Sequence, residues 1–305
     1  MHLHITVMKT TITLHRLVPS EAWMATALAA LVLIPLETRA ETLFGLTTSG
    51  SLISFDSSSP GTLLNSVAIS GLGGESLIGI DLRPNGGALY GVGSGNSIFT
   101  LNTATGAATL AGTLGTGLSG AGFGFDFNPV PDRLRVVGTD EQNLRINVGT
   151  GATLVDGSLA YAVGDANAGA NPNVVGAAYA NNVNGALTTT LYGIDSSLDI
   201  LVTQAPPNAG TLNTVGALGI DTTGAVGFDI SGSGIAYAAL TDGINSLSSL
   251  YAINLSTGSA SLIGQIGGGS SVYGLTAVPE PAEYGMMIGG ALLGLAALRR
   301  RQHRA

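Results

Sequence analysis

The sequence predicts an all-β protein, a β-propeller of five four-stranded blades, and three observations lead to this prediction. Short apolar runs alternate with turn residues along residues 41–277, which is typical of β-strands. Four kinds of run recur in a fixed order, with a period of about 40 to 50 residues. The cycle opens in mid-unit and is completed only after the last unit. Four-stranded units repeated around an axis make a propeller.

The first strand of each unit combines a glycine, an apolar residue, a small or acidic residue and another apolar residue. Its copies are Gly79–Leu82, Gly124–Phe127, Gly176–Tyr179, Gly227–Ile230 and Gly274–Ala277. Glycine in a strand marks places where backbones approach closely. We therefore expect these strands to be the innermost ones, at the crowded centre of the ring.

Three further strands complete each unit. The second-strand copies are Leu43–Leu46, Leu89–Val92, Leu134–Val137, Leu191–Ile194 and Ile235–Leu240. The third-strand copies are Leu52–Asp56, Ile98–Asn102, Leu144–Val148, Leu198–Val202 and Leu250–Asn254. A Thr-Gly turn follows at Thr105-Gly106, Thr150-Gly151 and Thr257-Gly258, and last strands end near Leu110, Leu154, Val215 and Ile263.

The ends of the repeat region predict how the ring closes. The region opens with a second-type strand at Leu43, and the missing first strand, Gly274–Ala277, follows the last unit. We expect these two strands to pair and to complete one blade. A sixth blade would need strands within residues 157–176, whose composition is typical of a loop. An open β-sandwich or a β-helix is the alternative architecture.

Composition excludes several classes of function. Residues 41–278 contain fifteen acidic residues and four arginines, a formal charge of −11. This charge argues against nucleic acid and anionic membrane surfaces as partners. The same residues contain no Cys, His, Lys or Trp. Histidine triads, thiol chemistry, imidazole or thiolate metal ligands and lysine Schiff bases are therefore excluded there.

Residues 1–40 have the layout of a secretory signal peptide. Lys9 and Arg16 precede an apolar run, Met24–Leu36, and Thr38-Arg39-Ala40 is a suitable signal peptidase site. A retained membrane anchor is the alternative, although the apolar run is short for a bilayer core of about 30 Å. We expect the chain to be exported.

Residues 278–305 have the layout of a sorting signal. A Pro279-Glu280-Pro281 motif precedes an apolar stretch, Tyr284–Leu298, and an arginine cluster follows it. The cluster includes Arg299, Arg300 and Arg301. Such a helix would enter the inner membrane, with the arginines holding its end on the cytoplasmic side. An ordinary single-pass anchor is the alternative.

This tail resembles the PEP-CTERM sorting domain of bacterial proteins. The resemblance implies a Gram-negative bacterium that makes exopolysaccharide, and an exosortase that removes the tail after export. It also implies only transient contact with the inner membrane through the transmembrane helix. The mature protein would then lie in the periplasm, on the cell surface or in the extracellular matrix, with exopolysaccharide as a partner.

The repeat region resembles an uncharacterised bacterial family, the domain of unknown function numbered 4394. The stretches GFDFNPVPDRLRVVG (Gly124–Gly138) and GDANAGANPNVVGAAY (Gly164–Tyr179) carry this resemblance. It implies no activity.

Asp81, Asp126 and Asp229 occupy equivalent places in three first strands. If these strands line a central channel, the carboxylates would face one another and could hold a hard cation such as Ca²⁺. Alternatively, each aspartate accepts hydrogen bonds within its own turn. Asp165 opens a polar loop that also has oxygen donors at alternate positions, although Asx turns give the same composition. We expect no other cofactor.

Arginine is concentrated in the third unit. Arg133 and Arg135 share one face of a strand, Arg145 lies on the next strand, and Asp140 and Glu141 lie in the turn between. Guanidinium groups that converge here would bind carboxylate or uronic acid groups of a polysaccharide. The alternative is an arginine–aspartate network, for example through Asp126, that ties two blades together.

Three functions fit these features. The first is a non-catalytic binding or scaffold protein of the cell envelope or exopolysaccharide matrix. The second is a polysaccharide hydrolase or lyase that uses Asp126, Asp140 and Glu141 as acids and Arg135 as a charge stabiliser. The third is a purely structural surface protein.

Overall fold

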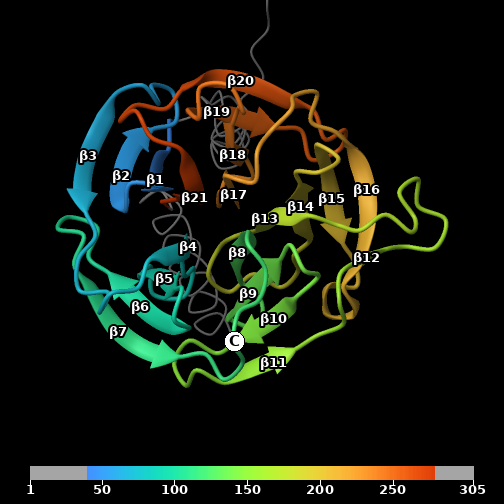
Figure 1. The fold of residues 1–305 in the computed structure, drawn as a ribbon, viewed down its shortest axis with the longest axis horizontal. Helices are drawn as coiled ribbons and strands as arrows, with labels where there is room; N and C mark the ends of the chain where they lie inside the picture. The colour runs from blue at the N-terminus through green and yellow to red at the C-terminus, as the bar shows by residue number, and fades with distance from the viewer. Residues whose placement is uncertain (1–39, 279–305) are drawn as a thin grey trace, which may run out of the picture. The chain divides into compact units, whose positions relative to one another are not determined.

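The computed structural model describes residues 40–278 of the 305-residue chain. The predicted signal peptide up to Arg39, and the sorting motif and arginine cluster from Pro279 onward, lie outside the described residues. The described part forms a ring of five β-sheets, the blades, as Figure 1 shows. The predicted five-bladed propeller is confirmed.

We number the blades in chain order. Blade one contains β21 (Val272–Ala277), β1 (Thr42–Thr47), β2 (Ser51–Asp56) and β3 (Leu63–Ala68). Blade two contains β4 (Leu77–Leu82), β5 (Leu89–Gly93), β6 (Ser97–Leu101) and β7 (Ala108–Thr113). Blade three contains β8 (Phe123–Asn128), β9 (Arg133–Gly138), β10 (Asn143–Ile146) and β11 (Thr153–Val155).

Blade four contains β13 (Val174–Tyr179), β14 (Leu191–Asp195), β15 (Ile200–Gln204) and β16 (Thr211–Ala217), with a short 3₁₀ helix, η1 (Pro207–Ala209), before β16. Blade five contains β17 (Val226–Ile230), β18 (Ala236–Thr241), β19 (Ser248–Ile253) and β20 (Ala260–Gln265). The segment that could have hidden a sixth blade adds only β12 (Ala160–Tyr161), which pairs in parallel with the edge of β16.

The two ends of the described region close the ring as predicted. β21 pairs antiparallel with β1, with Leu275 opposite Gly45 and Ala277 opposite Leu43. Blade one is therefore built from both ends of the region. This pairing closes the ring through backbone hydrogen bonds, without any disulfide.

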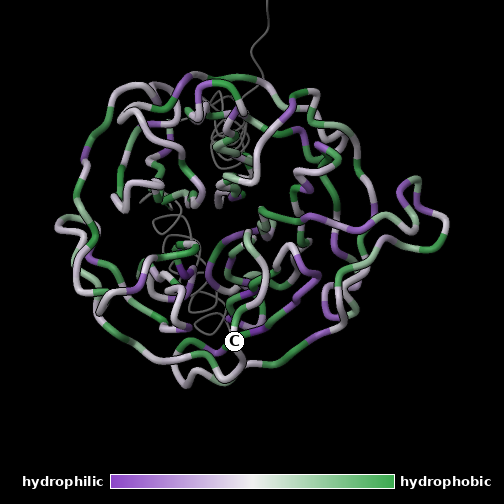
Figure 2. Tube along the Cα trace, in the orientation of Figure 1, coloured by the Kyte–Doolittle hydropathy of each residue, from purple (hydrophilic) through white to green (hydrophobic). Residues whose placement is uncertain are grey.

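Hydrophobic side chains fill each of the five junctions between neighbouring blades. The structure contains five separate core clusters, and each draws residues from two adjacent blades. Figure 2 accordingly shows hydrophobic segments in every blade. Because the strands of each blade pack against neighbouring blades on both faces, apolar residues follow one another nearly continuously along the strand and do not strictly alternate with polar ones.

The centre of the ring is packed rather than open. The space where the first strands meet is only about 10 Å³, about the smallest volume that can hold one water molecule. A Cβ atom on Gly124 would lie 2.7 Å from the Ala177 nitrogen, and one on Gly227 would lie 2.8 Å from Leu275 Cβ. The expectation of an open central channel is therefore wrong at this level, because glycines let the backbones meet.

A hollow of about 290 Å³ lies at one end of the axis, lined in part by Leu77, Phe123 and Tyr273. These residues precede the glycines in their strands, so the hollow ends at the glycine constriction. Among residues 40–278, no helix is long and apolar enough to cross a membrane.

Candidate functional site

Three aspartates gather at the axis of the ring, and we call them the aspartate ring. Asp81 on β4, Asp126 on β8 and Asp229 on β17 each hold the third position of their four-residue first-strand copy and are 1% exposed. One carboxylate oxygen from each lies within 4.8 Å of the others. The structure thus brings together the three residues that the repeat alignment singled out.

The aspartates are held by backbone groups of the next blade. Oδ2 of Asp81 accepts the Phe127 N–H at 2.7 Å, and Oδ2 of Asp229 accepts the Ala277 N–H at 2.6 Å. Asp126 Oδ2 accepts the Tyr179 N–H in the same manner. The predicted alternative was hydrogen bonds within each aspartate's own turn. At two of the three sites Oδ1 instead accepts the N–H of the next residue in the same strand, at 2.7 Å.

The other two blades present Thr276 and Ala178 at the equivalent position. The Thr276 hydroxyl donates to Asp81 Oδ1 at 2.8 Å. Ala178 offers no polar group, and a side chain from outside the strands lies near the axis in its place. Asn182, which follows β13, is buried and lies with its Nδ2 3.4 Å from Asp229 Oδ1.

Two oxygens of this region have no hydrogen-bond partner. Three buried side-chain atoms within residues 40–278 are unpartnered, and two of them are Asp126 Oδ1 and Asn182 Oδ1. Native proteins leave few buried polar atoms unpaired, because each costs about 1–3 kcal/mol. Both atoms therefore call for an explanation.

Burial raises the pKa of all three carboxyl groups. For Asp229, burial and then the charge of Asp81 raise the pKa to about 7. For Asp126, burial and then the charges of Asp81 and Asp229 raise the pKa well above its ordinary value. The pKa of Asp81 is also raised by burial. Three carboxylates this close disfavour one another's charged forms.

The aspartate ring has the donor set of a hard-cation site, because carboxylate and amide oxygens are the ligands that Ca²⁺ prefers. Asp165, the fourth predicted metal ligand, is not part of it. Asp165 accepts the Thr214 N–H at 2.7 Å, the Thr214 hydroxyl at 2.7 Å and the Asn167 N–H at 2.9 Å. Its carboxylate thus ties the polar loop to β16.

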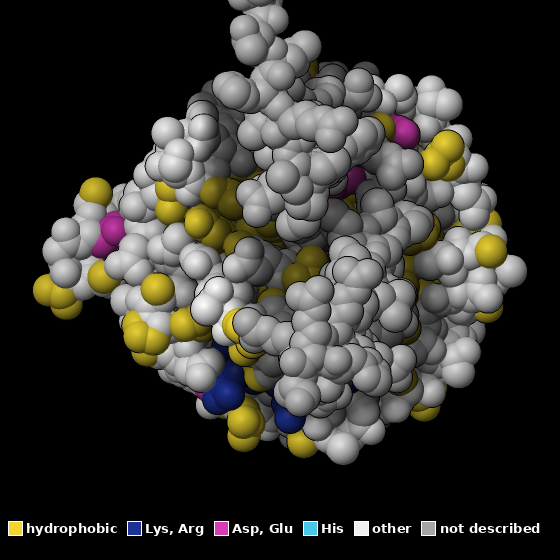
Figure 3. All heavy atoms as spheres, turned by 180° about the vertical axis from the view of Figure 1, so that it is seen from behind, with side chains coloured by type: hydrophobic (Ala, Val, Ile, Leu, Met, Phe, Trp, Pro, Cys, Tyr) yellow, Lys and Arg dark blue, Asp and Glu magenta, His cyan; other side chains and the backbone are white. Residues whose placement is uncertain are grey.

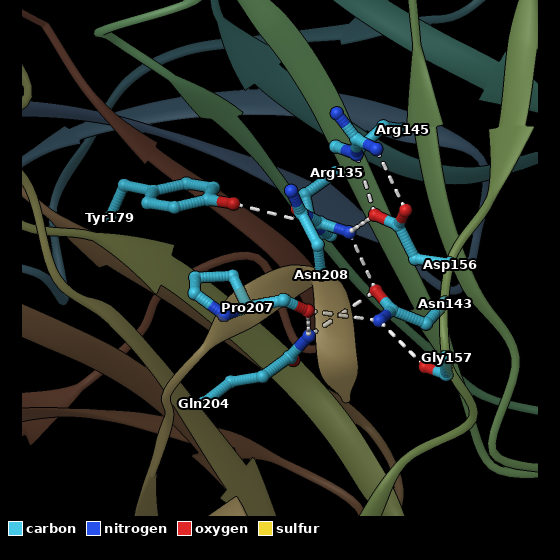
Figure 4. Close-up of polar contacts among 9 residues, drawn as sticks. All are labelled: Arg135, Asn143, Arg145, Asp156, Gly157, Tyr179, Gln204, Pro207 and Asn208. Carbon is cyan, nitrogen blue, oxygen red and sulfur yellow. Dashed lines mark hydrogen bonds and ion pairs between the residues drawn. The ribbon is translucent and has the colours of Figure 1, made fainter. Parts of the chain in front are cut away.

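Arg135 is the centre of a second buried polar cluster, which we call the Arg135 network (Figure 4). The side chain is 1% exposed and lies across the junction of blades three and four. Its Nη1 donates to Asp156 and Asn143, both at 2.7 Å. Nη2 donates to Asn208 Oδ1 at 2.8 Å, and Nε donates to the Tyr179 hydroxyl at 3.2 Å.

The sequence predicted, as an alternative, a network of arginine and aspartate that joins two blades through Asp126. The Arg135 network is of this kind, but its acid is Asp156. Asp126 lies directly opposite Arg135 in the β8–β9 ladder, yet the ion pair is with Asp156. Arg145 also binds Asp156, with contacts of 2.6 and 2.8 Å. Although burial acts to raise the pKa of Asp156, the bonds from Arg145 and Arg135 lower it overall.

Arg133 and Arg145, unlike Arg135, reach the surface. They line a hollow of about 210 Å³ on blade three with Asn147, Ala152 and Leu154. Arg133 donates to the carbonyl oxygens of Pro131 and Asp132 at 3.1 and 2.9 Å. In the part of the face that Figure 3 shows in colour, the dark blue side chains of Lys or Arg lie at the lower rim.

Asp140 and Glu141 lie in the turn after β9, as predicted. Within residues 40–278 no hydrogen bond or ion pair joins either of them to Arg133, Arg135 or Arg145. Asp126 is buried in mid-strand, so the structure does not gather the three proposed acids around one hollow.

Sequence reasoning missed several residues of both clusters. Thr276 had a usable signal, because it holds the third position of the last first-strand copy. Asn182, Asn208 and Asp156 had none, since they lie outside the repeat pattern and reach their partners only through the fold.

The fold and its site define a class, a five-bladed propeller with buried aspartates at the axis. The chain belongs to the family described as Domain of unknown function (DUF4394), which matches residues 51–276. No curated protein matches the sequence.

Several solved structures are similar to this chain. A Nidogen/Laminin complex shares 13% identity with a TM-score of 0.47, over 79% of this chain and 98% of that chain. A Bacteroides thetaiotaomicron protein of unknown function shares 16% with a TM-score of 0.45, over 73% and 58% of the two chains. A putative 6-phosphogluconolactonase from Bacteroides fragilis shares 17% with a TM-score of 0.39, over 77% and 70%. These similarities carry no argument about function.

Proposed function

We propose that this is an exported, non-catalytic binding or scaffold protein of the cell envelope or exopolysaccharide matrix. We further propose that the hollow between Arg133 and Arg145 binds carboxylate groups of acidic sugars. Export, signal peptidase and exosortase processing, and the Gram-negative envelope as the location, are supported by the sequence patterns at the two ends.

One observation carries the binding proposal: Arg133 and Arg145 line the same hollow of about 210 Å³. The four arginines of the described region are Arg83 and the three of blade three. Within residues 40–278 their ion pairs involve two carboxylates, those of Asp132 and Asp156. The four arginines thus outnumber the two carboxylates with which they form ion pairs, on a ring that is otherwise acidic.

The geometry of each arginine leaves donors for a ligand. Arg145 uses Nε and Nη2 for Asp156, and its side chain is 30% exposed. Arg133 uses Nη1 for carbonyl oxygens. A guanidinium group offers five N–H donors in a planar fork that matches a carboxylate. Each charged hydrogen bond contributes about 1.5–3 kcal/mol.

The test is to produce the full chain in a Gram-negative host that makes an acidic exopolysaccharide, and to measure how much protein stays with the matrix. We expect the wild type to be exported and retained. The double variant Arg133→Gln/Arg145→Gln should be exported equally but retained at least about tenfold less, since loss of about 1.4 kcal/mol has this effect.

Arg83→Gln is the matched control, because Arg83 pairs with Asp132 outside the hollow and its loss should leave retention unchanged. Equal retention of the double variant would contradict the binding site. Shortening of the polymer by the wild type would favour the hydrolase or lyase alternative. Protein that stays in the cytoplasm would contradict the proposed export.

A further inference from the structure

We propose that the aspartate ring, completed by Asn182, is a structural calcium site at the axis of the propeller. The inference is independent of the sugar-binding proposal, because it concerns different residues. It rests on the spacing of the oxygens, on the two unpartnered atoms and on the balance of charge.

The spacing fits calcium. Oxygen ligands lie about 2.3–2.6 Å from Ca²⁺, so two ligands on opposite sides of the ion are about 4.8 Å apart. One oxygen from each aspartate lies within 4.8 Å of the others. Spacings up to this value are compatible with one ion shared by all three carboxylates.

Both unpartnered atoms belong to residues at the aspartate ring. Asp126 Oδ1 belongs to the ring itself, and Asn182 Oδ1 belongs to the side chain whose Nδ2 lies 3.4 Å from Asp229 Oδ1. A half turn of the Asn182 amide exchanges its oxygen and nitrogen, which have nearly the same size. The oxygen would then lie 3.4 Å from Asp229 Oδ1. Two ligands at right angles around a calcium ion lie about 3.4 Å apart.

The repeat explains why Asn182 is needed. Four blades place a polar side chain at the third position of the first strand, and blade four places Ala178 there. The missing donor leaves a gap in the circle of ligands, beside Asp229. Asn182, which is 7% exposed and follows the same strand, fills that gap from the loop. We therefore interpret Ala178 in the strand and the buried Asn182 together: the asparagine supplies the polar group that the alanine lacks.

The charge of the ring lacks a partner in the described chain. Arg135 faces Asp126 across the β8–β9 ladder, but it donates to Asp156, Asn143, Asn208 and Tyr179 instead. Buried carboxylates are normally paired or bound to metal. A divalent cation would leave the site with a formal charge of −1 and would give Asp126 Oδ1 a partner.

Calcium suits these donors better than other cations. Mg²⁺ needs a tight octahedron of about 2.0–2.1 Å and retains waters, for which this buried site has little room. Transition metals prefer imidazole and thiolate ligands, and residues 41–278 contain no His or Cys. Ca²⁺ accepts oxygens in a flexible geometry. The ion would join three blades at the axis, so its role is to hold the ring together.

The experiment measures metal content and thermal stability of the full chain in mild detergent. We expect about one calcium per chain by mass spectrometry of the purified protein. After removal of metal with a chelator, Ca²⁺ at about 100 times its Kd should raise Tm by about 5–10 °C, and Mg²⁺ should not. Absence of both retained calcium and a calcium-induced shift would overturn the proposal.

Variants assign the site. Asp126→Asn should abolish the calcium-induced shift, and Asn182→Ala, outside the strands, should weaken calcium binding at least about tenfold. Asn182→Ala keeps the test decisive if Asp126→Asn does not fold. Asp165→Asn is the matched control and should retain the full shift. A shift lost in Asp165→Asn but kept in Asp126→Asn would place calcium in the loop and overturn the inference.

Discussion

The Arg135 network and the aspartate ring are both buried polar clusters at blade junctions, but their charges are balanced differently. Arg135 has an acid, two amides and a phenol as partners, all supplied by the chain. The aspartate ring has three acids and an unpartnered oxygen. The chain itself satisfies the buried charge of Arg135, whereas the buried acids of the aspartate ring need either a cation or a raised pKa.

The comparison also separates the two kinds of arginine in blade three. Arg135 was predicted as a ligand-binding residue, yet it is buried, and four of its five N–H donors bind partners within the chain. Arg145 lies directly opposite it on β10 and is 30% exposed. The buried Arg135 thus binds groups at the junction of blades three and four, whereas the neighbouring, partly exposed Arg145 remains accessible at the surface.

The largest expected effect is on the Arg135 network. Arg135→Met should lower the free energy of unfolding by about 3–5 kcal/mol, because it leaves buried amide and phenol groups without their donor. Urea unfolding of the purified protein measures this change. Arg145→Met is the matched control and should cost about 1 kcal/mol or less, since that pair is partly exposed. Similar losses in both variants would show that burial does not distinguish the two arginines.

The effect on the aspartate ring should have the opposite sign. In calcium-free protein, Asp126→Asn should raise the free energy of unfolding by about 1–3 kcal/mol. The substitution removes a buried charge. In the wild type, Asp126 Oδ1 has no hydrogen-bond partner, whereas the side-chain amide of the variant can donate an N–H to Asp81. Urea unfolding after chelation measures the gain. A loss of stability would show that the Asp126 carboxylate is already balanced within the chain.

The aspartate ring and the closure of the propeller could be predicted from the sequence because both follow the repeat. Equivalent positions in a repeat have equivalent places in a ring, so Asp81, Asp126 and Asp229 had to meet at the axis. The pairing of Leu43 with the strand at Leu275 followed from the offset between the ends.

The contacts between blades could not be predicted, because they depend on residues outside the repeat. Arg135 reaches Asn208, 73 positions along the chain, in the 3₁₀ turn before β16. Which acid pairs with Arg135 is decided by the side-chain directions of β9 and of the segment after β11. The closed centre was also missed, since the glycines predicted crowding but not how far it would go.

The smallest effect that we expect for each pH unit is a change in the free energy of unfolding. This change should differ in direction between the aspartate ring and the Arg135 network. The pKa of Asp229 is raised from its ordinary value of 3.8 to about 7. The folded protein therefore binds more protons than the unfolded chain between about pH 4 and 7. Stability falls as the pH rises through this range, by at most about 1.4 kcal/mol per pH unit and proton.

Asp156 should act in the opposite direction. Its pKa is lowered by the two arginines, so its contribution is present above the ordinary value and is lost as the pH falls below about 4. Urea unfolding of metal-free protein at about pH 3 to 7 tests the pair. The increase in the free energy of unfolding that Asp126→Asn causes should become smaller toward pH 4. At that pH the wild-type Asp126 is protonated and, like the amide, carries no charge. A gain that stays constant with pH would mean that the aspartates keep their charges when buried, and the contrast with the Arg135 network would then fail.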